Sequence, residues 1–183
     1  MKRHSWGGNH YEEFAYEYET PFSLNSPLTD QSFNTTEAPI LTDFFGQSHE
    51  LKMICGTGVD IAETSRIEQG LERHEERFTK KLFTPAEIAY CEKFKNRAKR
   101  YAARFAAKEA AFKALGTGWR EGIRWLDVEV VHQPSGKPEL VLTGRAQEVA
   151  RGLRVARMSI SISHSDRYVV AMVIFEGDDE AQA

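Results

Sequence analysis

Cysteine is scarce in this sequence, and long apolar runs are absent. The two cysteines among 183 residues, Cys55 and Cys91, lack the spacing of a disulfide framework or a metal motif. We therefore expect a reducing, cytoplasmic setting in which both thiols pack as small hydrophobic residues. No run approaches the roughly 18 apolar residues of a membrane-spanning helix. No apolar signal segment follows the first residues, so we expect neither a membrane protein nor a secreted one.

The common phosphate-binding and nucleophile motifs are absent as well. Gly-Thr-Gly occurs at residues 56–58 and 116–118, but neither copy has the longer fixed spacing of a Walker A loop or a dinucleotide fingerprint. No ordered set of serine, histidine and aspartate suggests a catalytic triad. The chemistry therefore has to be sought in individual polar residues on otherwise apolar elements.

Charge is unevenly distributed along the chain, although the net charge is only −3. Residues 1–52 hold three basic and eight acidic residues, and residues 176–183 hold four acidic residues and no basic one. The stretch between them, 53–175, holds 21 basic and 15 acidic residues. A basic body of this kind predicts an anionic partner, such as a phosphate ligand, a nucleic acid or an acidic protein.

The hydrophobic pattern divides the chain into three parts. Residues 1–52 show no sustained period and mix polar residues with isolated aromatics, which predicts a disordered extension. A mis-assigned start, with the protein beginning at Met53, is an alternative explanation of this segment. Residues 53–175 carry the pattern of one ordered domain, and residues 176–183 form an acidic tail.

Apolar periodicity in the ordered part predicts strands and helices without regular βαβ alternation, which is typical of the α+β class. We expect a small antiparallel sheet packed against a long helix. Thr84, Pro85 and Glu87 form a helix start with a capping box. A break near Asn96 precedes the long helix, which Gly116 ends. The predicted strands are 53–61, 125–131, 139–142, 158–162 and 168–175, and the predicted helices are 63–74, 84–94, about 97–115 and 143–151.

Two polar residues stand where apolar strands end. Asp60 follows two glycines, and a half-buried carboxylate there is costly unless it is paired or metal-bound. His164 continues the face of Ile160 and Ile162, where it suits phosphate binding or proton transfer. An ordinary turn or cap residue explains Asp60 as well, and a satisfied core or turn histidine explains His164.

The long helix carries a charged pair beside an apolar stripe. Glu109 lies on the same face as Phe105 and Phe112, and Lys113 follows Glu109 by one turn. A simple Glu109–Lys113 pair is one interpretation, since glutamate before lysine at this spacing stabilises a helix. The functional interpretation is that Glu109 meets Asp60 across a divalent ion while Lys113 faces a phosphate. Carboxylates together with substrate phosphates are the ligands that Mg²⁺ prefers.

Three stretches together resemble the holo-[acyl-carrier-protein] synthases, the short class of 4′-phosphopantetheinyl transferases. They are Gly58-Val59-Asp60-Ile61 with Arg66-Ile67, the helix from Arg104 to Gly116, and Ser161-Ile162-Ser163-His164-Ser165. The resemblance covers about 120 residues, from Ile54 to about Phe175. It implies the phosphopantetheinyl transferase fold and the transfer of the phosphopantetheine arm of coenzyme A to a serine of an apo acyl carrier protein, with release of adenosine 3′,5′-bisphosphate.

The resemblance also implies roles for individual residues. Asp60 and Glu109 match the family's magnesium ligands, and Glu109 is the candidate base for the carrier serine. Lys113 would stabilise the diphosphate and protonate the leaving group, and His164 matches a position near coenzyme A. The further phosphate contacts that we expect, on weaker grounds, are Arg104, Lys108 and Lys137.

The expected partners follow from the same resemblance together with the charge pattern. Coenzyme A is the donor, and an acidic acyl carrier protein docks on Arg66, Arg73 and Arg77, which form one stripe if their helix extends far enough. A solvated helix face with internal salt bridges is the alternative for that stripe. The short class further implies a homotrimer with sites between subunits. We expect neither a nucleic acid nor a membrane as partner.

Two other functions remain open from the residues themselves. The first is a Mg²⁺-dependent phosphohydrolase or nuclease that uses Asp60, Glu109 and Lys113, which the basic body permits. The second is a non-catalytic carrier-protein binding module. The intact set of Asp60, Glu109, Lys113 and His164 argues against the second.

Overall fold

The computed structural model describes residues 41–42, 48–49, 53–118 and 122–177. Within the expected extension, the described residues are β1 (Leu41–Thr42) and β2 (Ser48–His49), which pair as a short antiparallel ladder. The rest of that extension and residues 178–183 of the tail lie outside the described residues. The predicted disorder and the predicted domain boundaries therefore stay predictions.

The described chain from Met53 is an α+β domain, as the sequence pattern predicted. Its strands are β3 (Met53–Glu63), β4 (Val128–His132), β5 (Pro138–Leu142), β6 (Val155–His164) and β7 (Tyr168–Gly177). Its helices are α1 (Thr64–Leu82), α2 (Pro85–Cys91), α3 (Arg97–Ala114) and α4 (Gly144–Gly152), with a short 3₁₀ turn, η2 (Trp125–Asp127). In the part of the chain covered by these elements, no helix is both long and apolar enough to cross a bilayer.

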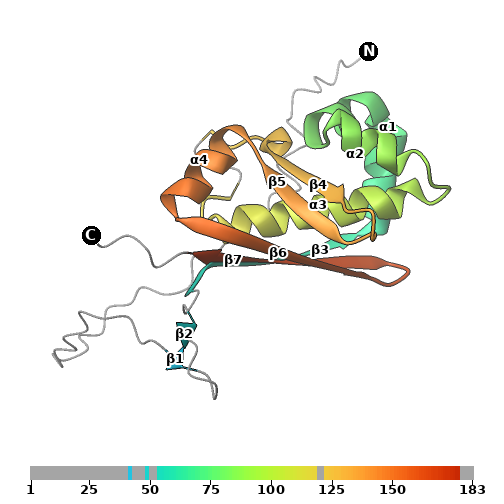
Figure 1. The fold of residues 1–183 in the computed structure, drawn as a ribbon. Helices are drawn as coiled ribbons and strands as arrows, with labels where there is room; N and C mark the ends of the chain where they lie inside the picture. Colours follow the sequence, from blue (N-terminus) through green and yellow to red (C-terminus); the bar gives the residue numbers. More distant parts are fainter. Residues whose placement is uncertain (1–40, 43–47, 50–52, 119–121, 178–183) are drawn as a thin grey trace, which may run out of the picture. The chain divides into compact units, whose positions relative to one another are not determined.

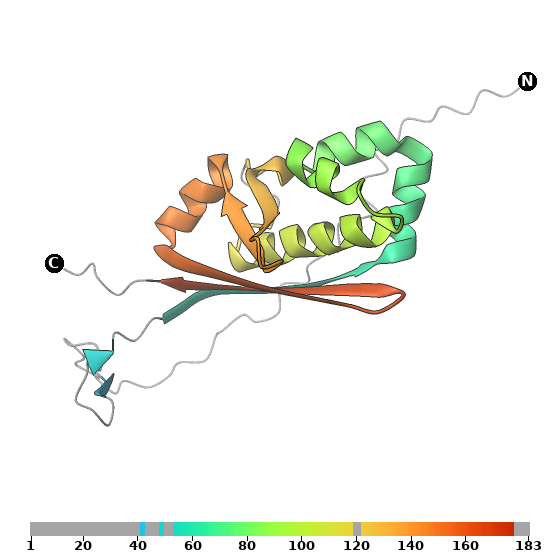
Figure 2. The same cartoon turned by 45° about the vertical axis from the view of Figure 1, so that its right-hand side comes forward.

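Helix α3 lies between two groups of elements (Figures 1 and 2). On one side is the antiparallel sheet in the order β3-β7-β6, and on the other are α1, α2 and the β4–β5 hairpin. Thirteen of the 18 residues of α3 are buried. The helix can be enclosed so closely because its sheet-facing side is mostly alanine, which adds little bulk.

Glycines on β3 allow the sheet to approach α3 at backbone distance. A Cβ atom built on Gly58 would overlap the carbonyl oxygen of Ala110, and one built on Gly56 would overlap that of Ala114. Only glycine fits such a close approach. The contact fixes the level of β3 along the helix, and it brings Asp60, two residues beyond Gly58, beside the helical turn before Ala114.

The structure confirms several local predictions. Glu87 N donates to Thr84 Oγ1 at 3.2 Å and Thr84 N donates to Glu87 Oε2 at 2.9 Å, which is the expected capping box. Asn96 caps α3 by accepting a hydrogen bond from Lys99 N. Gly116 follows the end of α3 with a positive φ of 75°, as expected of a C-terminal stop.

Several element boundaries differ from the prediction: the helix expected over 84–94 ends at Cys91, and the strand expected over 158–162 spans Val155–His164. Two further differences have a clear physical reason. Helix α1 does not end near residue 74 but continues to Leu82, because Phe78 and Leu82 extend the buried stripe of Ile67 and Leu71. Residues 125–127 are a 3₁₀ turn and not the start of a strand. The buried carboxylate of Asp127 accepts hydrogen bonds from the backbone and guanidinium of Arg124, and these bonds close that turn.

The two cysteines differ in their surroundings. Cys91 is fully buried, and burial raises the pKa of its thiol to about 12, so it behaves as an inert apolar side chain. Cys55 packs against the core but is only partly buried. The prediction that both are buried is confirmed for Cys91 and holds in part for Cys55.

Candidate active site

A partly buried ion pair joins β3 to α3. The ammonium of Lys113 lies 3.0 Å from Asp60 Oδ1 and donates to the carbonyl oxygen of Val59 at 2.9 Å. Asp60 is only 6% exposed and pairs in register with Ala171 on β7. Burial raises the pKa of the Asp60 carboxyl, and the hydrogen bond and charge of Lys113 oppose that rise. The Asp60 carboxylate is therefore held in a place where it needs a cation.

Glu109 lies one helical turn before Lys113, on the part of α3 that faces this ion pair. Its side chain is 8% exposed, which is low for a glutamate. Gly58 contacts Ala110 at the start of this turn of α3, and Asp60 contacts Lys113 at its end. Asp60 therefore lies against the end of the helical turn that begins at Glu109, 49 residues away in the sequence.

The donor set at this place fits a magnesium ion. In the described part of the chain, no group of three or more His, Cys, Asp and Glu side chains could hold a metal. Two carboxylates, Asp60 and Glu109, are what Mg²⁺ takes from a protein when substrate phosphates and waters complete its shell. The fit is therefore to a magnesium ion that binds together with a phosphate ligand.

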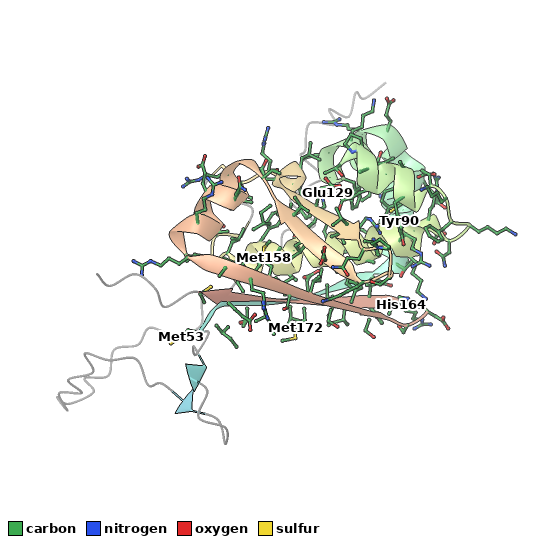
Figure 3. All side chains as sticks on the ribbon, viewed as in Figure 1. Met53, Tyr90, Glu129, Met158, His164 and Met172 are labelled. Carbon is green, nitrogen blue, oxygen red and sulfur yellow. The ribbon has the colours of Figure 1, made fainter. Side chains whose placement is uncertain are left out.

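His164 lies on the same face of the sheet but away from the ion pair. It pairs with Val169, as Ile162 pairs with Ala171, so its side of β6 faces α3. Two strand spacings and two residues separate the Cα atoms of His164 and Asp60, a distance of about 12 Å. His164 is exposed at the end of β6, next to the turn into β7 (Figure 3). One chain therefore does not bring His164 into contact with Asp60.

Arg104 is buried on the opposite side of α3 in a second cluster. Its guanidinium lies 4.1 Å from the centre of the Tyr90 ring and 3.4 Å from His132 Nδ1. The His132 ring stacks on Tyr90 at 4.7 Å, and burial and the charge of Arg104 lower the pKa of His132. Arg104 is 2% exposed, and its Nε has no hydrogen-bond partner among the described residues. A buried donor without a partner is costly and suits an anionic ligand.

Sequence reasoning missed Tyr90 and His132 as neighbours of Arg104. They come from α2 and β4, and no local spacing connects them with Arg104. Lys137, by contrast, is exposed in the β4–β5 turn, directly before Pro138, which pairs with His132. Lys137 therefore lies at the same end of the hairpin as this cluster.

Lys108 is fully buried and has a structural role. It lies 2.7 Å from Glu87 Oε2 and donates to the carbonyl oxygens of Leu82 and Trp125 at 2.8 and 3.0 Å. A lysine has three donors, so these acceptors use all of them. In this arrangement Lys108 has no donor left for a phosphate, in contrast to the contact that we expected, and it anchors α3 to α1, α2 and η2.

The three arginines of the predicted docking stripe lie on one helix. Helix α1 extends through Arg66, Arg73 and Arg77, and Arg73 and Arg77 are exposed while Arg66 is partly exposed. The buried stripe of α1 lies about 120° around the helix from these arginines. The stripe therefore faces away from the core.

The predicted ligand contacts do not converge within one chain. Arg104 and Lys113 are nine residues apart on α3, which is about two and a half turns. Their contacts agree with this, because Arg104 meets α2 and β4 whereas Lys113 meets β3. A single ligand held by both side chains from one chain would have to pass around α3.

Known proteins resemble this chain closely. The holo-[acyl-carrier-protein] synthase of Koribacter versatilis is 52% identical over 124 residues, which are 68% of this chain and 99% of that protein. A crystal structure of the synthase from Neisseria meningitidis matches with a TM-score of 0.62 at 33% identity, over 68% of this chain and 99% of that one. The synthase of Helicobacter pylori, in complex with coenzyme A, matches with a TM-score of 0.58 at 29% identity, over 65% and 98%.

The family model of the 4′-phosphopantetheinyl transferase superfamily matches residues 56–173, from the glycines of β3 to the centre of β7. That range contains the ion pair of Asp60 and Lys113, Glu109 and the Arg104 cluster. The relatives match over nearly their whole lengths, so the similarity covers the complete fold of those enzymes. The chain belongs to the 4′-phosphopantetheinyl transferase superfamily and, within it, to the holo-[acyl-carrier-protein] synthases.

Proposed function

We propose that this enzyme transfers the 4′-phosphopantetheine group of coenzyme A to a serine of an apo acyl carrier protein and releases adenosine 3′,5′-bisphosphate. The observation that carries the proposal is the Asp60–Lys113 pair beside Glu109, in a member of this superfamily. Two buried carboxylates and an ammonium suit a Mg²⁺-assisted reaction at a diphosphate. The expected setting is the cytoplasm, with fatty acid synthesis as the process supplied.

Each charged side chain has a separate role in the proposed reaction. Glu109 accepts the proton of the carrier serine, whose oxygen forms a bond to the phosphorus atom that carries the pantetheine arm. The bond from that phosphorus to the oxygen of the nucleotide phosphate breaks. Lys113 balances the charge on the diphosphate and donates a proton to the leaving oxygen. A magnesium ion held by Asp60 and Glu109 would neutralise the charge that develops on the phosphates.

The Arg104 cluster supports a second phosphate contact. The unpartnered Nε of Arg104 and the nearby exposed Lys137 suit the phosphate on the ribose of coenzyme A. Because Arg104 and Lys113 face opposite sides of α3, we propose that one coenzyme A molecule meets Lys113 of one subunit and Arg104 of a neighbour. His164, about 12 Å from Asp60 in one chain, would join the same shared site.

The outer face of the sheet supports the homotrimer that such shared sites need. Val59 pairs with Met172 and Ile61 pairs with Val170, and all four side chains lie on the face away from α3. Each is between 37% and 54% exposed. Figure 3 shows Met172 below the sheet, on the side opposite α3. A contiguous apolar face of this kind is typical of a subunit interface.

Placing a charge on this face should separate the subunits. In Val170→Asp a carboxylate would be buried in an apolar interface, so we expect a monomer by light scattering and a loss of transfer activity. Val141→Asp is the matched control, because Val141 on β5 is 41% exposed and Val170 is 37% exposed. A Val170→Asp protein that keeps the mass of the unmodified assembly would contradict the proposed interface.

The carrier protein is proposed to dock on the arginine stripe of α1. Arg66, Arg73 and Arg77 attract an acidic surface, and such steering weakens as salt screens the charges. Raising the ionic strength should therefore raise the KM for the carrier protein more than the KM for coenzyme A.

Intact-protein mass spectrometry tests the reaction itself. An apo acyl carrier protein incubated with the enzyme, coenzyme A and Mg²⁺ should gain the mass of one phosphopantetheinyl group, and EDTA should prevent the gain. A binding module would leave the carrier mass unchanged, and a phosphohydrolase or nuclease would cleave its substrate without modifying the carrier. No gain with several carriers and a folded enzyme would overturn the proposal.

A further inference from the structure

Lys113 pairs with Asp60, a carboxylate that the proposed function assigns to a metal ion. Its ammonium lies 3.0 Å from Asp60 Oδ1 and donates to Val59 O at 2.9 Å, so two atoms of β3 hold it. Val59 and Asp60 are neighbours on a strand that pairs along its length with β7. The two oxygen atoms of β3 therefore form a preformed binding site for one cation.

The two partners differ in how far their charged groups can move. Asp60 is 6% exposed on a strand locked against α3 by the glycine contacts, so its carboxylate has little room to move. Lys113 is 27% exposed, and its ammonium is carried by a flexible four-carbon stem. The ammonium can therefore swing away while the carboxylate stays in place.

A divalent ion and the Lys113 ammonium compete for Asp60. Two cations beside one buried carboxylate repel each other strongly, because the low dielectric of the interior screens them poorly. A strong anion nearby would draw the ammonium away from Asp60. The diphosphate of coenzyme A is the anion that the proposed reaction brings to this place.

We propose that Lys113 is a built-in counter-ion that holds Asp60 until the diphosphate draws the ammonium away and a divalent ion takes its place. The proposal rests on the proposed function for the identity of the diphosphate. Its consequence is thermodynamic: coenzyme A raises the affinity for the metal, and the metal raises the affinity for coenzyme A by the same factor. Removal of the Lys113 charge should strengthen metal binding in the absence of coenzyme A and reduce this coupling.

The test measures metal binding without turnover. The full-length protein is titrated with Mn²⁺, whose free concentration is read by electron paramagnetic resonance, with and without coenzyme A and with no carrier protein present. Lys113→Met should bind Mn²⁺ alone at least about fivefold more tightly than the unmodified protein, the lower end of typical coupling factors. The enhancement of Mn²⁺ affinity by coenzyme A should fall by a similar factor.

Three further variants make the result specific. Lys113→Gln should repeat the effect of Lys113→Met, so a folding defect in one of them does not decide the outcome. Lys113→Arg keeps the charge and should bind Mn²⁺ alone as the unmodified protein does. Lys80→Met removes an exposed lysine that pairs with Glu76 on α1, and it should leave Mn²⁺ binding unchanged.

The outcomes separate this proposal from the proposed function. If both neutral variants bind Mn²⁺ alone no more tightly than the unmodified protein, the counter-ion proposal is wrong, whatever the enzyme transfers. If coenzyme A does not bind to the unmodified protein, the proposed transfer is wrong, while the comparison of Mn²⁺ affinities still decides the role of Lys113.

Discussion

Replacing Glu109 with glutamine should reduce phosphopantetheine transfer by about a thousandfold, the middle of the range for a lost general base. The substitution keeps the size of the side chain and removes its charge and its basicity. It therefore removes the candidate acceptor of the serine proton and one of the two carboxylates proposed for Mg²⁺. The rate is measured by intact-protein mass spectrometry at saturating coenzyme A and carrier protein.

A matched control separates this effect from a general loss of charge. Glu148→Gln removes an exposed carboxylate on α4 that pairs with Arg145, and it should leave the rate unchanged. Circular dichroism should show the same fold for both variants, since Glu109 lies at the edge of the core and the glutamine has the same shape. A Glu109→Gln enzyme with a near-normal rate would show that our role for Glu109 is wrong.

The second large effect is on stability. Replacing Lys108 with methionine should lower the free energy of unfolding by about 3–5 kcal/mol, the cost of leaving a buried charge without its partner. Glu87 and Lys108 both have fully buried side chains, 2.7 Å apart. Burial lowers the pKa of Lys108 while the charge of Glu87 opposes that change, so Lys108 depends on Glu87 to stay charged.

Urea unfolding measures this effect, with all samples at one protein concentration because assembly also contributes to stability. Lys137→Met is the control: Lys137 is exposed in a turn, so its change should stay within about 0.5 kcal/mol. The double variant Glu87→Gln, Lys108→Met should recover part of the loss, because it leaves no buried charge without its partner. The recovery is partial because the one oxygen of glutamine can accept from Thr84 N or from Val130 N, which the carboxylate binds with separate oxygens. A Lys108→Met protein as stable as the unmodified one would contradict the structural role of the pair.

The stability of this pair also bears on function. Lys108 precedes Glu109 and ties α3 to Leu82 and Trp125, so it sets the position of the helix that carries Glu109 and Lys113. Substitution of Lys108 therefore risks a loss of activity through misplacement of α3 and not through loss of a phosphate contact. The two explanations differ in their signatures, since a lost phosphate contact would raise the KM for coenzyme A without changing stability.

Local sequence patterns were sufficient for much of this protein. The capping box of Thr84 and Glu87, the break at Asn96 and the stop at Gly116 each depend on residues within four positions of one another. The α+β class followed from the mixture of periods, and the residues quoted for the family resemblance lie inside the range that the family model matches. The largest error was in the extent of α1, because its polar surface obscured the apolar stripe that continues to Leu82.

Only the tertiary structure decided which charges meet. The structure pairs Lys113 with Asp60, 53 residues away, because glycines let β3 lie against α3, and no local pattern in the sequence shows this pair. It likewise paired Lys108 with Glu87 and placed Arg104 on the opposite side of the helix beside Tyr90 and His132. The physical reason is that hydrogen bonds and periodicity within an element are local, whereas the partner of a long charged side chain depends on which element packs against it.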